Sequence, residues 1–266
     1  MKSDESTDTG AATLTGASTP ACVEAALFDV FGTVVNWRGG LIAALNEVQK
    51  EIGIQRDCGE IADAWHKAYL RRGSQICAGI QPWMDMDALN AEIIDELIGQ
   101  FSLRGIMPNH RRRLVLAWHQ FSPWSDVVPG LSRIKRSLLI APLSSGHTAL
   151  LAALAKNAGL PWDLLISSEL FNQYKPHPSV YIGACKLLHR TPERVLMVAS
   201  HQEDLAAARD IGLRTAFVFR RDEFGVGAVR PELTGRWDYL ADDFNSLANQ
   251  LAASCPEGAW RNYASR

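Results

Sequence analysis

The chain has 266 residues, of which 47% are hydrophobic and 21% are charged, the balance of an ordinary globular protein with room for a core domain and a smaller inserted one. Its formal net charge of -2, from 27 basic and 29 acidic side chains, argues against nucleic acid or an anionic membrane as a partner. Five cysteines with no CxxC pair argue against a disulfide framework or a cysteine zinc site and favour a reducing cytoplasm.

The N-terminal part of the chain divides into a tail, one strand and a helical region. Residues 1–22 are mostly small and polar, so we expect a disordered tail, and they lack the basic-then-apolar pattern of a secretory signal. Residues 25–28 (AALF) form a short apolar run typical of a buried strand, which ends abruptly at Asp29. Residues 38–125 show helical spacing and no strand candidate, so they predict a helical cap that lies over the carboxyl edge of the sheet.

Short apolar runs and helical patterns alternate along the rest of the chain. The apolar runs are residues 138–140, 164–166, 195–198 and 216–219, and the helical patterns include 148–158 and 204–211. This alternation predicts a Rossmann-like α/β core, a parallel sheet with helices on both faces. The core takes residues 23–37 and 126–254 and is followed by a C-terminal tail, 255–266. Pro-containing stretches at 121–124 and 128–130 mark the return from the cap, and no apolar stretch is long enough to span a bilayer.

Four polar motifs follow the predicted core strands. Asp29 lies in FDVFGT, Ser144 in LSSG, Lys175 in YKP and Asp204 in VASHQED. Taken singly, each has an ordinary structural explanation, such as a helix cap, a solvated lysine or an acidic residue in a first helical turn. Because ligands bind at the carboxyl ends of parallel strands, the four motifs together predict one site at that edge of the sheet.

In this order, the four motifs resemble those of the haloacid dehalogenase superfamily of hydrolases, and more narrowly those of the type II 2-haloacid dehalogenases. The resemblance runs from about residue 25 to residue 225 and is strongest in FDVFGTVVNWR, LSSGH, AGLPWDLL, YKPHPSVY and VASHQEDLAAARDIGLRTAFV. Phosphatases of the superfamily carry a proton-donating Asp two residues after the nucleophile and an acidic metal ligand four residues before a second acid. Phe31 and Ser200 occupy those positions here, so we expect no metal and no cofactor.

The resemblance implies covalent catalysis in two steps. Asp29 would displace the halide from a short 2-haloacid, and water would then hydrolyse the resulting ester to a 2-hydroxyacid with inversion. Lys175 would neutralise and orient Asp29, and Asp204 would activate the water together with His201. The other implied site residues are Thr33 and Tyr181 as supporting hydrogen-bonders, Ser144 and Ser145 as ligands of the substrate carboxylate, Ser200 as a further substrate-binding residue, and Phe31 as part of an apolar wall.

One position departs from the type II pattern. These enzymes receive the halide on an Arg of the first cap helix, and the aligned residue here is His66 in AWHKAY. Histidine is shorter and only partly charged near neutral pH. His66 is therefore a weaker halide receptor, or Arg38 in NWR takes that role, or the substrate is not a haloacid. Ser145 and His201 also stand where the best-known members have Asn, which indicates a sub-branch.

Three alternatives stay open beside a 2-haloacid dehalogenase. The same Asp29 ester would serve another carbon-centre hydrolase, such as one that opens a small strained ring bearing a carboxylate. A phosphatase would show magnesium-dependent activity, and a non-catalytic scaffold would have no need of the side chains gathered around Asp29. The expected partner is a small halocarboxylate, and family members are often dimers, which leaves a homodimer open.

Overall fold

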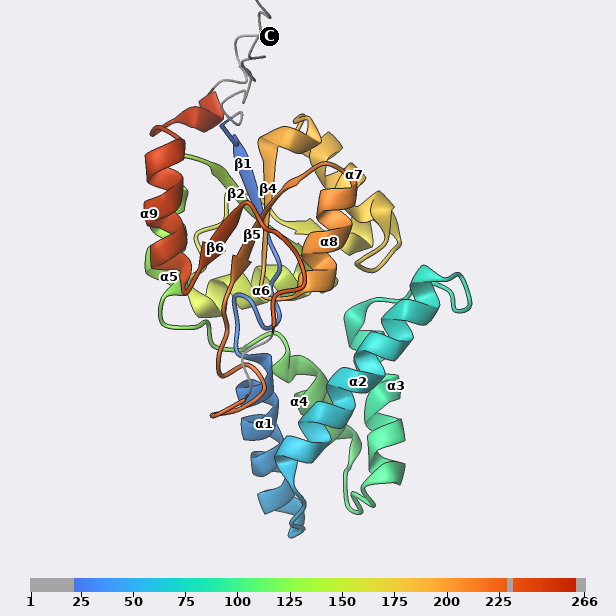
Figure 1. Ribbon diagram of the computed structural model, residues 1–266. Coiled ribbons are helices and arrows are strands. Elements are labelled where there is room, and N and C mark those ends of the chain that lie inside the picture. The colour runs from blue at the N-terminus through green and yellow to red at the C-terminus, as the bar shows by residue number, and fades with distance from the viewer. Residues whose placement is uncertain (1–21, 229–231, 262–266) are drawn as a thin grey trace, which may run out of the picture.

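The computed structural model describes residues 22–228 and 232–261 and has an α/β architecture (Figure 1). Within these residues, six strands form one sheet in the order β3-β2-β1-β4-β5-β6, and all neighbouring strands pair in parallel. The strands are β1 (Ala25–Phe28), β2 (Leu139–Ser144), β3 (Ile166–Ser167), β4 (Val195–Ala199), β5 (Arg214–Val218) and β6 (Tyr239–Ala241). The predicted α/β fold is confirmed, whereas the tail predicted for residues 1–22 lies outside the described residues except for Cys22.

Helices cover both faces of the sheet. One face carries α5 (Val127–Ile134), α6 (Thr148–Ala158) and α9 (Phe244–Ser254). The other face carries α7 (Pro178–Leu187) and α8 (Gln202–Asp210). Two short 3-10 helices, η1 (Ser168–Phe171) and η2 (Pro192–Arg194), lie in the connections. Successive side chains of a strand point to opposite faces. Phe28 of β1 therefore packs with α5, α6 and α9, whereas Leu27 packs with α7 and α8.

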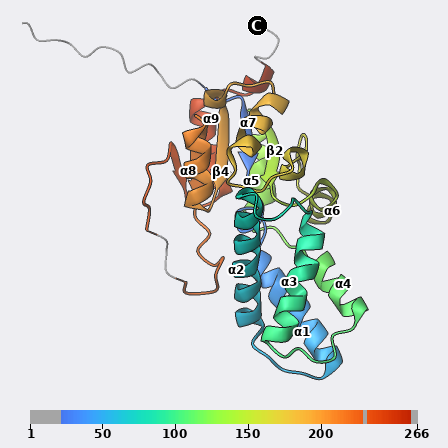
Figure 2. The same cartoon turned by 90° about the vertical axis from the view of Figure 1, so that its right-hand side faces the viewer.

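Four helices between β1 and α5 form a separate bundle, which we call the helical insert (Figures 1 and 2). They are α1 (Trp37–Ile52), α2 (Cys58–Cys77), α3 (Met86–Gln100) and α4 (Pro108–Ala117). Side-chain caps set two of their starts, because Asp57 accepts the backbone N–H of Gly59 and Asp85 accepts that of Ala88. The insert leaves the sheet directly after β1, so it lies beyond the carboxyl ends of the strands.

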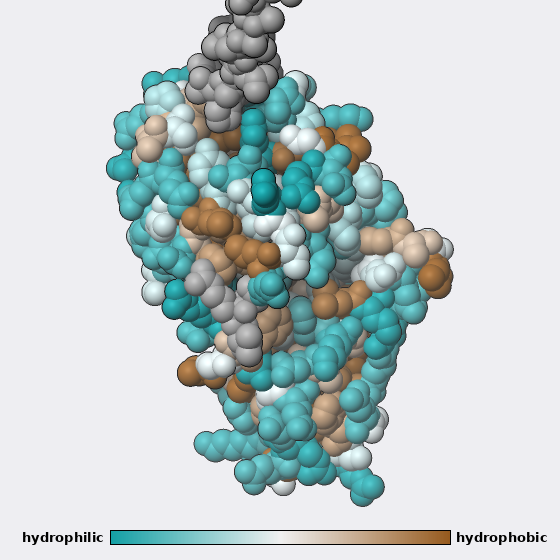
Figure 3. Space-filling view, viewed as in Figure 1, coloured by the Kyte–Doolittle hydropathy of each residue, from teal (hydrophilic) through white to brown (hydrophobic). Residues whose placement is uncertain are grey.

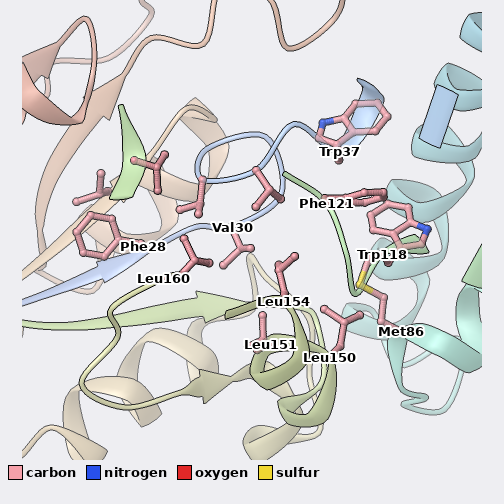
Figure 4. Close-up of a cluster of buried hydrophobic side chains, with 14 of the residues drawn as sticks. Phe28, Val30, Trp37, Met86, Trp118, Phe121, Leu150, Leu151, Leu154 and Leu160 are labelled. Carbon is pink, nitrogen blue, oxygen red and sulfur yellow. The ribbon is translucent and has the colours of Figure 1, made fainter. Parts of the chain in front are cut away.

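One hydrophobic core joins the helical insert to the sheet (Figure 4). Its members come from β1 and the loop after it (Phe28, Val30), from α6 (Leu150, Leu151, Leu154), and from the insert and the loop that follows it (Trp37, Met86, Trp118, Phe121). Protein interiors pack as densely as organic crystals and transmit displacements. The position of the insert is therefore set by this shared packing as well as by its two connections to the sheet.

Three details differ from the sequence-based expectations. Residues 128–130, expected as a turn, lie inside α5, because Pro129 falls in the first helical turn, where a missing N–H costs no hydrogen bond. Gly130 is needed there for close packing, since a Cβ at this position would collide with Phe244 of α9. The third strand begins only at Ile166, and β6 and α9 lie in a region for which no specific element was expected.

None of the described helices is long and apolar enough to cross a membrane. The face seen in Figure 3 is largely hydrophilic, with hydrophobic residues scattered in small groups. The predicted C-terminal tail is docked on the core as far as residue 261, because the backbone N–H of Trp260 donates to the carbonyl of Ser137 at 3.2 Å and Cys255 is buried.

Candidate active site

A cavity of about 660 Å³ lies between the carboxyl edge of the sheet and the helical insert. The predicted site residues that line it are Asp29, Phe31, His66, Ser144, Ser145, Lys175, Ser200, His201 and Asp204. Thr33 and Tyr181 lie just outside this lining, where they hydrogen-bond to Asp29 and Asp204. Of the predicted set, only Arg38 neither lines the cavity nor hydrogen-bonds to one of these lining residues, because it pairs with Asp63.

Register in the sheet explains why the polar residues meet. Phe28, the last residue of β1, pairs with Pro142 of β2 and with Val198 of β4. The residues that follow each strand therefore emerge at the same edge, with Asp29 in the centre. The backbone N–H of Asp29 donates to the carbonyl of Val198 at 2.9 Å, which fixes the start of its loop.

Both carboxylate oxygens of Asp29 are held by donors. Lys175 Nζ lies 2.7 Å from Oδ1, while Thr33 Oγ1 donates to Oδ2 at 2.6 Å and His201 Nδ1 lies 3.1 Å from Oδ2. Burial raises the pKa of Asp29, but the positive charges of Lys175 and His201 outweigh it and hold the pKa well below its ordinary range. A carboxylate that is ionised, oriented and shielded from water suits a nucleophile.

Lys175 stands between two buried carboxylates. Its Nζ lies 2.5 Å from Asp204 Oδ2 as well as close to Asp29, and the hydroxyl of Tyr181 donates to Asp204 Oδ1 at 2.5 Å. Burial lowers the pKa of Lys175, but the two carboxylates raise it above its ordinary value, so the ammonium is retained. Burial raises the pKa of Asp204, and the negative charge of Asp29 adds to that rise.

Glu223 is a site residue that the sequence reasoning missed. Its side chain is buried, with the residue 3% exposed, and Oε1 accepts from His201 Nε2 at 2.8 Å and from Trp37 Nε1 at 3.0 Å. Burial lowers the pKa of His201, but Glu223 and Asp29 raise it well above its ordinary value. His201 is thus an imidazolium that donates to a carboxylate through each ring nitrogen. The only available signal was that Glu223 follows a core strand, as the other site residues do.

The segment between β2 and α6 offers hydroxyls and backbone donors beside Asp29. Ser144 and Ser145 are 1% and 7% exposed. Ser144 Oγ accepts the backbone N–H of Gly146 at 3.1 Å, and Ser145 Oγ accepts that of Lys175 at 3.4 Å. This short polar turn leads into α6, whose N-terminal end favours negative charge. It suits the carboxylate group of a small acid.

His66 and Arg38 have different surroundings. The ring of His66 stacks on Trp37, with centroids 4.4 Å apart and planes 17° apart, and it lines the cavity. Burial, together with the charge of His201, lowers the pKa of His66 to about 4. Arg38 instead forms a two-point ion pair with Asp63, at 2.7 Å and 3.1 Å. Of the two candidates for an anion receptor, His66 reaches the cavity, and it does so as a neutral ring.

Aromatic side chains form the rest of the wall. Phe31 meets the edge of Trp118, with centroids 5.2 Å apart and planes at 77°. Tyr69 of α2 is partly buried, and loss of solvent raises its pKa to about 12 and keeps its phenol neutral. Tyr69 and Trp118 both line the cavity, although the sequence reasoning assigned neither to the site. A helical spacing alone does not tell whether an aromatic residue faces the core or a cavity.

Arg220 fixes the loop that carries Asp29. Its Nε donates to the carbonyl of Thr33 at 2.7 Å, and one terminal nitrogen lies 2.8 Å from Asp126 Oδ1. Asp126 in turn accepts the backbone N–H of Phe244 at the start of α9. This chain of contacts connects the end of β1 to the start of α5 and to α9, so it holds the loop in one conformation.

Comparisons with known proteins agree on one family. The model of the haloacid dehalogenase-like hydrolases matches residues 23–212. The structure of the L-2-haloacid dehalogenase PA0810 matches with a TM-score of 0.82 and 40% sequence identity, and the match covers 87% of this chain and 99% of the PA0810 chain. The structure of the defluorinating L-2-haloacid dehalogenase Rha0230 matches with a TM-score of 0.81 and 39% sequence identity, and the match covers 86% of this chain and 95% of the Rha0230 chain. The (S)-2-haloacid dehalogenase of Xanthobacter autotrophicus is 27% identical over 217 residues, which are 74% of this chain and 76% of that protein.

Proposed function

Because this chain belongs to the haloacid dehalogenase-like hydrolases, we propose that it hydrolyses the carbon–halogen bond of short 2-haloacids to give 2-hydroxyacids. The likeness to PA0810 and Rha0230, at 40% and 39% identity, supports this class of substrate. The observation that carries the proposal is the ionised Asp29, which lies in a cavity with an aromatic wall and has Phe31 where a phosphatase needs a proton donor.

In the first step, Asp29 attacks the carbon that bears the halogen. Oδ2 already accepts two hydrogen bonds, from Thr33 and His201, whereas Oδ1 accepts one from Lys175. Oδ1 is therefore the attacking atom. A carbon–oxygen bond forms as the carbon–halogen bond breaks, and the halide leaves with the bonding electron pair. Displacement occurs once at carbon, so a chiral centre inverts.

The halide departs toward the helical insert. A halide is a weak base and needs no proton, which agrees with the apolar Phe31 beside the nucleophile. His66 offers one ring N–H, and the aromatic rings around it offer their positively polarised edges. Since the pKa of His66 is about 4, this receptor stabilises the departing anion less than a guanidinium would.

In the second step, water attacks the ester carbonyl of Asp29. Thr33 and His201 donate to Oδ2 and stabilise the negative charge that develops there. Asp204, held by Lys175 and Tyr181, accepts the proton of the water. Collapse of the tetrahedral intermediate expels the product alkoxide, which takes up that proton and leaves as the 2-hydroxyacid. The second proton of the water stays on Asp29 until it is lost to solvent, which restores the carboxylate.

Lys175 makes a metal ion unnecessary for this chemistry. Its ammonium lies between Asp29 and Asp204 and neutralises both, in the place where a bridging cation would act. Ser200 supplies a hydroxyl, rather than a carboxylate, next to Thr33 at 3.1 Å. These two features support a mechanism that proceeds without a divalent cation.

Halide release tests the proposal directly. The purified protein is incubated with each enantiomer of 2-chloropropanoate in the presence of EDTA, and chloride and the chirality of the lactate are measured. We expect chloride release with inversion of one enantiomer, and a mass increase on Asp29 in the Asp204→Asn variant, in which the ester accumulates. No chloride with any short 2-haloacid, or a magnesium-dependent phosphatase activity instead, would overturn the proposal.

A further inference from the structure

A second cluster of reactive side chains lies outside the cavity. Asp87 in the first turn of α3, His119 in the loop after α4 and His147 at the start of α6 present ligand atoms that all lie within 4.8 Å of one another. His119 Nε2 lies 3.0 Å and 3.1 Å from the two oxygens of Asp87, and His147 Nε2 lies 3.8 Å from Oδ2. Within residues 22–228 and 232–261, this is the one group of three His, Cys, Asp or Glu side chains with such spacing.

The hydrogen bonds of this cluster are incomplete. The side chains of His119 and His147 are only 14% and 13% exposed. Buried polar atoms almost always have a partner, yet Nδ1 of His147 is buried and has none among the residues that the structure describes. Its Nε2 also stays beyond hydrogen-bond distance of Asp87. Nε2, the ring nitrogen that lies toward Asp87, is therefore the atom of His147 that is placed to bind an additional partner.

We propose that Asp87, His119 and His147 bind a divalent cation of the zinc class. Two imidazoles and one carboxylate are donors that zinc accepts at about 2.0–2.2 Å, which places ligand atoms about 3.4 Å apart in a tetrahedron. The observed separations from Asp87 Oδ2, 3.1 Å to His119 Nε2 and 3.8 Å to His147 Nε2, lie on either side of that value. Imidazole donors favour zinc, nickel or copper over magnesium and calcium, and water would complete the tetrahedron.

The charges around the cluster are compatible with a cation. The N-terminal end of α6 disfavours a bound cation, because its free backbone N–H groups carry partial positive charge. Glu169 offsets this effect, since its Oε2 accepts both the backbone N–H of Thr148, at 2.8 Å, and the hydroxyl of Thr148, at 2.7 Å. Together with Asp87, it supplies two negative charges beside the position of the ion. The site uses no cysteine, so the cysteine count of the sequence has no bearing on it.

A cation here would connect the two walls of the cavity. Asp87 belongs to the helical insert and His119 to the loop that follows it, whereas His147 belongs to the segment between β2 and α6. Trp118, next to His119, and Ser145, two residues before His147, both line the cavity. The bound ion would therefore restrain the insert relative to the sheet and slow the opening of the cavity, while it takes no part in bond breaking.

Zinc binding to the full chain tests this inference. Zinc chloride is titrated into EDTA-stripped protein, and the heat of binding is measured by calorimetry. We expect one equivalent to bind, with an affinity reduced by at least about 100-fold in His119→Gln and in His147→Gln, since removing a ligand costs more than removing its second-sphere partner. His189→Gln, on an exposed turn of the core, serves as the matched histidine control. Asp29→Asn should bind zinc as the wild type does, which excludes the cavity as the binding site.

Two further readouts keep the test decisive. Asp87→Asn preserves shape and removes the charge, so it should also weaken binding even where a histidine variant folds poorly. Hydrogen exchange at residues 118–121 and 144–148 should slow on zinc addition in the wild type and stay unchanged in His147→Gln. Absence of stoichiometric binding, or equal binding by the wild type and His147→Gln, would overturn the proposal. Calorimetry and hydrogen exchange measure zinc binding without turnover, and halide release is assayed in EDTA. The zinc proposal and the dehalogenase proposal can therefore fail independently of each other.

Discussion

The two walls of the cavity differ in the interactions that hold their side chains. On the sheet side, Asp29, Lys175 and Asp204 form a closed network of ion pairs at 2.5–2.7 Å, which is anchored on the ends of packed strands. On the insert side, His66 and Tyr69 are neutral and are held by ring stacking. Charged pairs have defined directions, whereas stacked rings tolerate small shifts. The proposed bond chemistry and the turn that suits a substrate carboxylate thus lie on the rigid wall, whereas the proposed halide contacts lie on the adaptable one.

The largest effect is expected at the centre of the rigid wall. Asp29→Asn removes the nucleophilic charge, so halide release should fall by at least about 10⁴-fold, as it does when other covalent enzymes lose their nucleophile. The assay is chloride release from 2-chloropropanoate. Asp95→Asn, which alters an exposed ion pair with Arg111 away from the cavity, is the matched control and should retain activity. Activity that survives in Asp29→Asn would mean that the reaction runs through another group.

A second test concerns the residue that ties the rigid wall together. Glu223→Gln keeps a hydrogen-bond acceptor for His201 but removes the charge that raises its pKa. The pKa of His201 should fall, so the alkaline limb of the kcat profile should move to lower pH. We expect kcat to fall by about 10- to 100-fold, with KM nearly unchanged. A lower melting temperature with an unshifted pH profile would instead indicate a purely structural role for Glu223.

A smaller effect is expected on the insert wall. His66→Ala should lower kcat/KM for 2-chloropropanoate by about 10-fold, the loss of one neutral hydrogen-bond donor and its packing. Because the pKa of His66 is about 4, the ratio of wild-type to variant activity should stay constant from about pH 6 to about pH 8, well above that value.

Arg38→Ala is the natural comparison for His66→Ala. It breaks the ion pair with Asp63 in the insert and should leave kcat/KM within about 3-fold of wild type, because surface ion pairs contribute little and Arg38 does not line the cavity. The measurement is the same chloride assay, run on both variants at equal concentrations of folded protein. The opposite order of effects, with Arg38→Ala the more damaging, would assign the halide receptor to Arg38.

The sequence predicted the residues on the sheet side because their positions follow from a general rule. Asp29, Ser144, Lys175 and Asp204 each follow a strand, and parallel strands bring their carboxyl ends to one edge. The same rule did not identify Glu223, which follows β5 by several loop residues and reaches the site only through the fold of that loop. The sequence also left open whether His66, the aligned residue, or Arg38 receives the halide, since the faces of α1 and α2 that meet are set by tertiary packing.

Trp37 belongs to both walls at once. It is the first residue of α1, its ring lies under His66, and its Nε1 donates to Glu223. An engineer who shortens this side chain to admit bulkier acids would also remove a partner of the carboxylate that keeps His201 charged. Pocket size and the acidity of the neighbouring imidazolium are thus coupled through a single indole, and a redesign for larger substrates has to enlarge the pocket elsewhere, for example at Tyr69 or Trp118.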